Sequence, residues 1–141
     1  MRTGREAAVF ITRGGELLLM HRTREDYWHV AAGVVEEGES FAEAAARELR
    51  KETGLALEPT DLERSQSYAI PDELRHEYTP GVAEVTIGNF VVEAPLGWEP
   101  VLNEEHDAYR WLGVADAIAL AHWPETFEII ATLAAPKREA R

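Results

Sequence analysis

The sequence predicts one domain of the α/β class, in which several β-strands accompany a smaller number of helices. The chain has 141 residues, of which 45% are hydrophobic and 28% charged, a balance typical of a compact globular domain with its own core. Short β-branched and aromatic runs between glycine and proline turns indicate strands, and one stretch combines helical spacing with caps at both ends. No internal repeat or low-complexity linker divides the chain, so residues 1–141 are expected to form a single domain.

The first strands are predicted close to the N-terminus. Residues 7–12 (AAVFIT) and 17–22 (LLLMHR) are apolar runs separated by a glycine turn at 13–16, a pattern that indicates a β-hairpin. Residues 27–34 (YWHVAAGV) are expected to form one further short strand, which brings the chain to Gly33. An acidic loop then leads into a helix.

The helix is predicted over residues 41–53. Ser40 followed by Glu43 forms a capping box at its start, because each residue can bind the other's backbone N–H. Gly54 stands where a left-handed C-terminal cap belongs. These two signals bound the helix at both ends.

Two glutamates lie on the predicted inner side of this helix. At about 100° per residue, Glu48 and Glu52 share a sector with Phe41 and Ala45, whereas Arg50 lies opposite. A solvated charged face is the ordinary interpretation of paired glutamates, and the phase argues against it here. Like charges four residues apart destabilise a helix by roughly 0.2–0.5 kcal/mol, which a bound divalent cation would offset.

The second half of the chain is expected to add three strands and two helices. In order, these are strands at 62–70 and 82–94 with a long polar loop at 71–81 between them, a strand at 106–114, and helices at 115–121 and 124–135. Pro124 suits the first turn of the last helix. Residues 136–141 are expected to be frayed.

Composition excludes several classes of function. The chain has no cysteine, which rules out disulfides, thiolate metal sites and cysteine nucleophiles and fits a cytoplasmic protein. A net charge of -12 without a basic cluster argues against a nucleic acid polymer as partner, and no apolar run is long enough to span a membrane. A small anionic substrate fits if a divalent cation neutralises charge where the two meet.

The helix and its approach resemble the Nudix box. That pattern is Gly, five residues, Glu, seven residues, Arg-Glu, an aliphatic, any residue, Glu-Glu, any residue, Gly and an aliphatic. The matching positions are Gly33, Glu39, Arg47, Glu48, Leu49, Glu52, Gly54 and Leu55. Of these, the six charged or glycine residues at fixed spacings make a chance match very improbable.

The resemblance implies a Nudix-type α/β/α sandwich with a mixed β-sheet between helices. It also implies hydrolysis of a nucleoside diphosphate linked to another group, with Mg²⁺, or alternatively Mn²⁺, as the cofactor. By resemblance, Glu48 and Glu52 bind the metal, Arg47 orients them, the Gly33 carbonyl is a third ligand, and Glu39 and Gly54 are structural. The protein is expected to act as a monomer or homodimer.

One position departs from the box, because Lys51 stands where the first glutamate of the Glu-Glu pair belongs. This exchange changes the local charge by two units and is expected to weaken metal binding. Two other interpretations stay open: Lys51 contacts a substrate phosphate, or it is a surface lysine without a role in the site.

Further site residues are expected outside the box. Glu105 resembles a glutamate that completes the metal site or acts as general base in related enzymes, with Glu104 as a neighbouring candidate, and His106 is expected to be structural. Phosphate contacts are expected from Arg22, Arg75 and His76, and stacking on a heterocycle from Tyr68 and Trp28. The competing interpretation is that these arginines are ordinary surface residues and that the aromatic residues pack in the core. Trp111 is assigned to the core.

The segments YWHVAAGVVEEGES, LRHEYTPGV and EHDAYRWL are similar to those of the dihydroneopterin triphosphate pyrophosphohydrolases. That likeness implies a reaction that releases pyrophosphate and leaves a pterin monophosphate. EHDAYRWL and GVADAIALA also resemble diadenosine tetraphosphate hydrolases, although Ala31 and Ala32 replace the proline-lysine pair usual there. Two more functions fit the sequence, a nucleoside triphosphate pyrophosphatase and a Nudix-fold binding module without hydrolysis.

Overall fold

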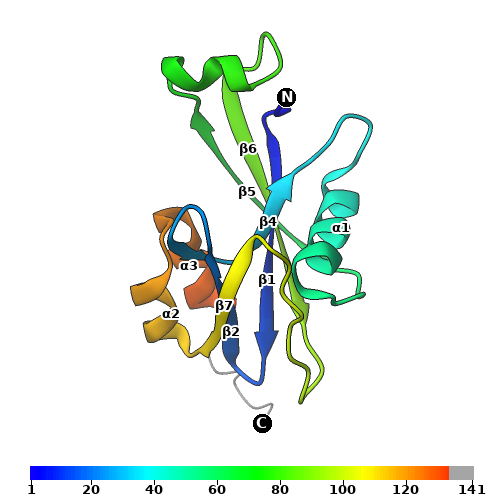
Figure 1. Ribbon diagram of the computed structural model, residues 1–141, viewed down its shortest axis with the longest axis vertical. Coiled ribbons are helices and arrows are strands. Elements are labelled where there is room, and N and C mark those ends of the chain that lie inside the picture. The colour runs from blue at the N-terminus through cyan, green and yellow to red at the C-terminus, as the bar shows by residue number, and fades with distance from the viewer. Residues whose placement is uncertain (134–141) are drawn as a thin grey trace.

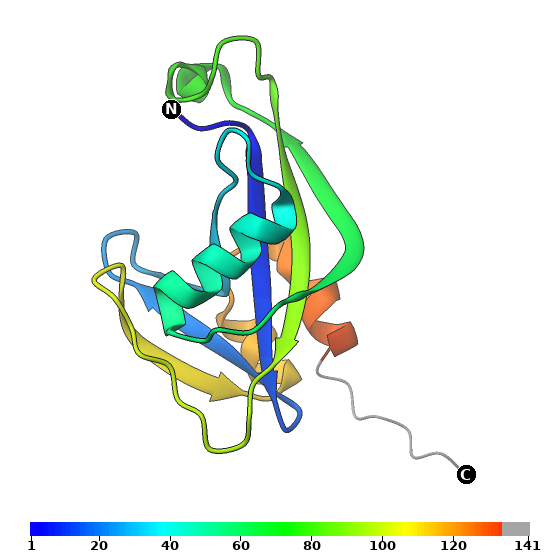
Figure 2. The same cartoon turned by 90° about the vertical axis from the view of Figure 1, so that its right-hand side faces the viewer.

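The structure, a computed structural model, describes residues 1–133 as a seven-stranded mixed sheet between helices (Figure 1). The strands are β1 (Arg5–Arg13), β2 (Glu16–Arg22), β3 (Tyr27–His29), β4 (Ala31–Val34), β5 (Thr60–Ala69), β6 (Glu84–Glu93) and β7 (His106–Leu112). Their order is β3-β2-β1-β6-β5, with β4 pairing β1 and β7 pairing β2. Helix α1 (Phe41–Thr53) covers one side, and α2 (Val114–Leu120) and α3 (Phe127–Leu133) cover the other (Figures 1 and 2). The predicted α/β/α sandwich is confirmed.

The sheet is built around β1, which is buried on both faces. Residues 7–11 are at most 4% exposed, and β1 pairs in parallel with β6 and antiparallel with β2 and β4. On the α1 side, Phe41 packs so closely over Gly88 of β6 that a Cβ there would lie 2.8 Å from the ring. This contact fixes the start of α1 against the sheet.

The predicted β1–β2 hairpin is confirmed. Arg13 pairs with Glu16, and the two residues between them, Gly14 and Gly15, have φ values of 57° and 86°. Two positive φ values in a two-residue turn match the right-handed twist of the strands and favour glycine at both positions.

The single strand predicted over residues 27–34 is wrong, because the structure has two strands there. β3 pairs with β2, whereas β4 pairs with β1, and Val30 lies buried between them. The chain therefore changes partner strand within one apolar run. The change places Gly33 opposite Ala7 and next to α1.

Helix α1 has the predicted bounds. The Ser40 hydroxyl accepts from the Glu43 N–H at 3.0 Å, Glu43 Oε1 accepts from the Ser40 N–H at 2.9 Å, and Gly54 is left-handed with φ 80°. Glu48 and Glu52 are 4% and 1% exposed, so the predicted inward face is confirmed.

The C-terminal half has the predicted order of strands and helices, with two 3-10 segments in addition. A 3-10 helix, η1 (Asp72–Glu77), forms inside the stretch expected to be a loop, at the tip of an arm made by β5 and β6 (Figure 1). Pro124 opens a second 3-10 turn, η2 (Pro124–Thr126), which runs into α3. Ala134 and Ala135 of the predicted last helix, and the tail at 136–141, lie outside the described residues. No described helix is long and apolar enough to cross a bilayer.

Candidate active site

Two buried carboxylates of α1 face β4. Glu52 Oε1 accepts a hydrogen bond from the Ala32 N–H at 3.3 Å. The Glu48 side chain lies directly over Gly33, where an added Cβ would come within 2.3 Å of Glu48 Cδ. A glycine at position 33 therefore makes room for the carboxylate of Glu48.

The guanidinium of Arg47 links α1 to the loop after β4. It donates two hydrogen bonds to Glu39, at 2.8 and 2.9 Å, one to the Val34 carbonyl at 2.8 Å, and one to Glu48 Oε1 at 2.5 Å. Glu39 in turn accepts from the Glu36 N–H at 2.9 Å. Arg47 thus holds one oxygen of Glu48, and Glu39 holds Arg47.

The pKa values of these acids diverge. Hydrogen bonds from Arg47 lower the pKa of Glu39 to about 2. Burial, and then the neighbouring Glu48 carboxylate, raise the pKa of Glu52 to about 10. A cation beside Glu48 and Glu52 would oppose this rise, because its charge favours the ionised carboxylates.

The pair Glu48 and Glu52 fits a hard divalent cation such as Mg²⁺. Both groups present oxygen ligands within about one helical turn, and the glycine at position 33 leaves room for the Glu48 side chain. Within residues 1–133, no three acidic or histidine side chains converge as a complete ligand set. The three-carboxylate arrangement expected from Glu48, Glu52 and Glu105 is therefore not assembled in this structure.

Lys51 lies between two of those carboxylates. Its ammonium is 3.8 Å from Glu48 Oε2 and 3.6 Å from Glu105 Oε2. Asn103 supports Glu105 by donating to its Oε2 at 3.1 Å and accepting from its backbone N–H at 3.1 Å. Glu104 is exposed, so the structure brings Glu105, and not its neighbour, to the site.

A buried histidine lies behind Glu52. His106 Nε2 is 4.0 Å from Glu52 Oε1, too far for a hydrogen bond, and neither ring nitrogen of His106 has a partner among the described residues. Burial, and then the charge of Arg22, lower the pKa of His106, which keeps the ring neutral at pH 7. His29 is similar, since burial lowers its pKa to about 3.

Arg22 lies near the buried carboxylates, and an aromatic cluster that contains Tyr27 and His122 lies beside Arg22. Arg22 forms an ion pair with Glu25 at 2.7 Å. Burial lowers the pKa of Arg22, but the bond to Glu25 and the charge of Glu52 raise it, and the net effect is a rise. Next to Arg22 in register, Tyr27 stacks on His122 with ring centroids 4.4 Å apart. Sequence reasoning missed this cluster, because residues 27 and 122 carry no local signal that they meet.

Four expected substrate contacts are not brought to the carboxylates. Arg75 and His76 lie in η1 at the tip of the arm, away from the end of α1 that carries Glu52 (Figures 1 and 2). Tyr68 is on β5, opposite Val85, which packs with Ile70 and Tyr78 of the arm. Trp28 packs against the core cluster on the α2 and α3 side, the face of the sheet opposite α1.

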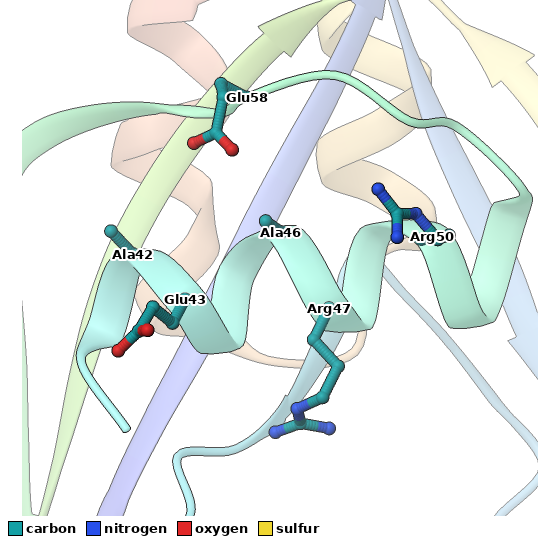
Figure 3. A pocket seen from close by; sticks show the side chains of 6 residues that line it. All are labelled: Ala42, Glu43, Ala46, Arg47, Arg50 and Glu58. Carbon is teal, nitrogen blue, oxygen red and sulfur yellow. The ribbon is translucent and has the colours of Figure 1, made fainter. Parts of the chain in front are cut away.

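A surface pocket also lies along α1. It is lined by Ala42, Glu43, Ala46, Arg47, Arg50 and Glu58 (Figure 3). Neither buried glutamate contributes to it, and Arg47 points away from Glu58 in this view (Figure 3). The pocket therefore does not include the Glu48 and Glu52 pair, although Arg47, which lines it, also binds Glu48.

Comparisons with known proteins identify the family of this chain. The family model of the NUDIX domain matches residues 2–133. Dihydroneopterin triphosphate diphosphatase of Escherichia coli K12 is 37% identical over 109 residues, 74% of this chain and 72% of that protein. Mouse asymmetrical bis(5'-nucleosyl)-tetraphosphatase is 35% identical over 112 residues, 77% of this chain and 71% of that protein. The structure of the E. coli dihydroneopterin triphosphate pyrophosphohydrolase matches with a TM-score of 0.81 at 30% identity, over 94% of this chain and 96% of that one. The chain therefore belongs to the Nudix family of hydrolases.

Proposed function

We propose that this protein hydrolyses dihydroneopterin triphosphate to its monophosphate and pyrophosphate, with Mg²⁺ or Mn²⁺ as cofactor. As a Nudix hydrolase it is a pyrophosphohydrolase and acts on acid anhydrides. The observation that supports a divalent cation as cofactor is the buried pair of Glu48 and Glu52, which faces Gly33 of β4. The similarity to the E. coli enzyme, over most of both chains, supports the substrate.

The residues of the site have different roles in the proposed reaction. Water attacks one phosphorus, an anhydride P–O bond breaks, and pyrophosphate leaves. Mg²⁺ bound by Glu48 and Glu52 would supply charge stabilisation at the phosphoryl oxygens and lower the pKa of water. Arg47 holds Glu48, and Glu105, partly exposed in its loop, is suited to accept the proton of the attacking water.

A dinucleoside polyphosphate is the second candidate substrate. The mouse tetraphosphatase is nearly as similar as the E. coli enzyme, so the fold and the carboxylate pair suit either substrate class. Recognition of the heterocycle then decides between them, and Tyr27 beside Arg22 offers the aromatic surface for it.

A substrate panel tests this proposal. Dihydroneopterin triphosphate, the common nucleoside triphosphates and diadenosine tetraphosphate are incubated with the protein and Mg²⁺, and products are identified by ³¹P NMR. We expect the highest kcat/KM with the pterin, giving pyrophosphate and a monophosphate. Turnover of nucleotides alone would exclude the pterin proposal, and a folded protein without turnover of any compound would exclude the mechanism.

A further inference from the structure

Lys51 holds together two carboxylates from distant parts of the chain. Glu48 belongs to α1 and Glu105 to the loop before β7, and the ammonium is less than 4 Å from each, at 3.8 and 3.6 Å. The side chain of Lys51 is 49% exposed, that of Glu48 5% and that of Glu105 32%, so water screens both contacts in part and the contact to Glu48 less. A metal ion that bridged these two acids would have to occupy the place of this ammonium.

The remaining contacts of the two acids keep them in this arrangement. Arg47 binds Glu48 Oε1, so cationic side chains face both oxygens of Glu48. Asn103 binds Glu105 Oε2, the same oxygen that faces Lys51. Glu105 is therefore held toward Lys51 by its own loop and is not gathered with Glu48 and Glu52 into one ligand set.

We propose that Lys51 is a built-in cation that takes the place of a second divalent ion, so that the free protein binds one ion through Glu48 and Glu52. Lys51 is thus a positioning residue, which keeps Glu105 out of the metal ligands and available as a base. The ammonium is tethered to α1, so its charge is present at every metal concentration. This inference rests on the proposed function, because the divalent ion belongs to the site of that function.

Equilibrium binding of Mn²⁺ to the full chain tests the proposal without substrate. Free Mn²⁺ is measured by electron paramagnetic resonance for the wild type, Lys51→Gln and Lys51→Glu, each with and without Glu105→Gln. Arg50→Glu is the matched control, because it makes the same change of two charge units on the exposed side of the same helix. Circular dichroism confirms that each variant is folded.

We expect the wild type to bind one Mn²⁺, with a Kd that Glu105→Gln changes by less than about twofold. Lys51→Glu should bind a second ion, which is lost again when Glu105→Gln is added. Lys51→Gln should lower the Kd for Mn²⁺ at Glu48 and Glu52 by about tenfold, since a competing positive charge is removed. Arg50→Glu should change this Kd much less, because water screens its charge.

Two outcomes overturn the proposal. One is a wild type that binds two ions. The other is a wild type whose Mn²⁺ affinity falls tenfold or more with Glu105→Gln, because Glu105 is then a ligand despite Lys51. Failure of the proposed function is separate: a protein that binds one ion as described and hydrolyses no phosphoanhydride keeps the role of Lys51 and excludes the activity.

Discussion

The side chains of Glu48 and Glu52 are ionisable and yet almost completely buried. The sequence predicts this combination, because helical phase alone places both acids on the side that carries Ala45. The pairing of Lys51 with Glu105 was not predictable, because it joins positions 54 residues apart through the docking of a loop (105 minus 51). The structural role of His106 was predicted, but its position 4.0 Å from Glu52 was not, because that contact depends on tertiary packing.

Replacing Gly33 tests the space that Glu48 needs. In Gly33→Ala the new Cβ would meet Glu48 Cδ at 2.3 Å, and the flexible end of that side chain would have to move. We expect kcat to fall about tenfold or more, because catalysis is sensitive to displacements of about 1 Å, with a small loss of stability. Gly113→Ala is the control, since a Cβ there meets no atom within 4 Å. Equal kinetics for the two variants would contradict the role given to Gly33.

Helix α1 shows why some elements are predictable to the residue and others are not. Its bounds depend on caps that lie next to it in sequence, at Ser40 and Gly54, and the structure keeps both. The division of residues 27–34 into β3 and β4 depends instead on which strands lie alongside, which the sequence of that segment does not encode.

The N-cap of α1 has a measurable contribution to stability. Ser40→Ala removes the hydrogen bond to the Glu43 N–H, and we expect a loss of about 1 kcal/mol in the free energy of unfolding. Ser65→Ala, at an exposed position of β5, is the control. Urea denaturation compares the two, and equal midpoints would show that the cap does not stabilise the protein.

The ion pair between Glu39 and Arg47 makes stability depend on pH. Because Arg47 lowers the pKa of Glu39 from 4.5 to about 2, the pair stabilises the fold above about pH 4.5, and this contribution is lost as pH falls toward 2. We therefore expect the stability difference between wild type and Glu39→Gln to be large at pH 6 and to shrink below pH 4.5. Urea titrations over this range measure it. Glu37→Gln, at an exposed position of the same loop, is the control. A constant difference for Glu39→Gln would contradict the assignment.

In the complete molecule, η1 and the ends of β5 and β6 next to it lie away from the end of α1 that carries Glu52 (Figures 1 and 2). The strand pattern predicted both strands of the arm, but not its direction, because strand order and the angle of a hairpin are set by the whole sheet. For this reason sequence reasoning grouped Arg75 and His76 with Arg22, although the fold places only Arg22 near Glu52. The net charge of -12 also makes a cationic contribution at the site important for any phosphate substrate.

The two arginines should accordingly differ in function. Arg22→Ala is expected to lower kcat/KM about tenfold or more, because it removes a guanidinium suited to phosphate near the carboxylates. Arg75→Ala makes the same chemical change at the tip of the arm and should leave kcat/KM within about twofold. Steady-state kinetics with one triphosphate substrate measures both. A larger loss with Arg75→Ala would place the substrate on the arm.

The carboxylate pair is tested most directly by Mg²⁺-dependent release of pyrophosphate from wild type and Glu52→Gln. The substitution keeps the size of the side chain and removes the charge that the cation requires. Circular dichroism and thermal unfolding establish that the variant is folded, and ³¹P NMR follows the products. We expect turnover by the wild type only with a divalent cation, and a loss of about a hundredfold or more in Glu52→Gln. Near-wild-type turnover by a folded Glu52→Gln variant would contradict the role of Glu52 as a metal ligand.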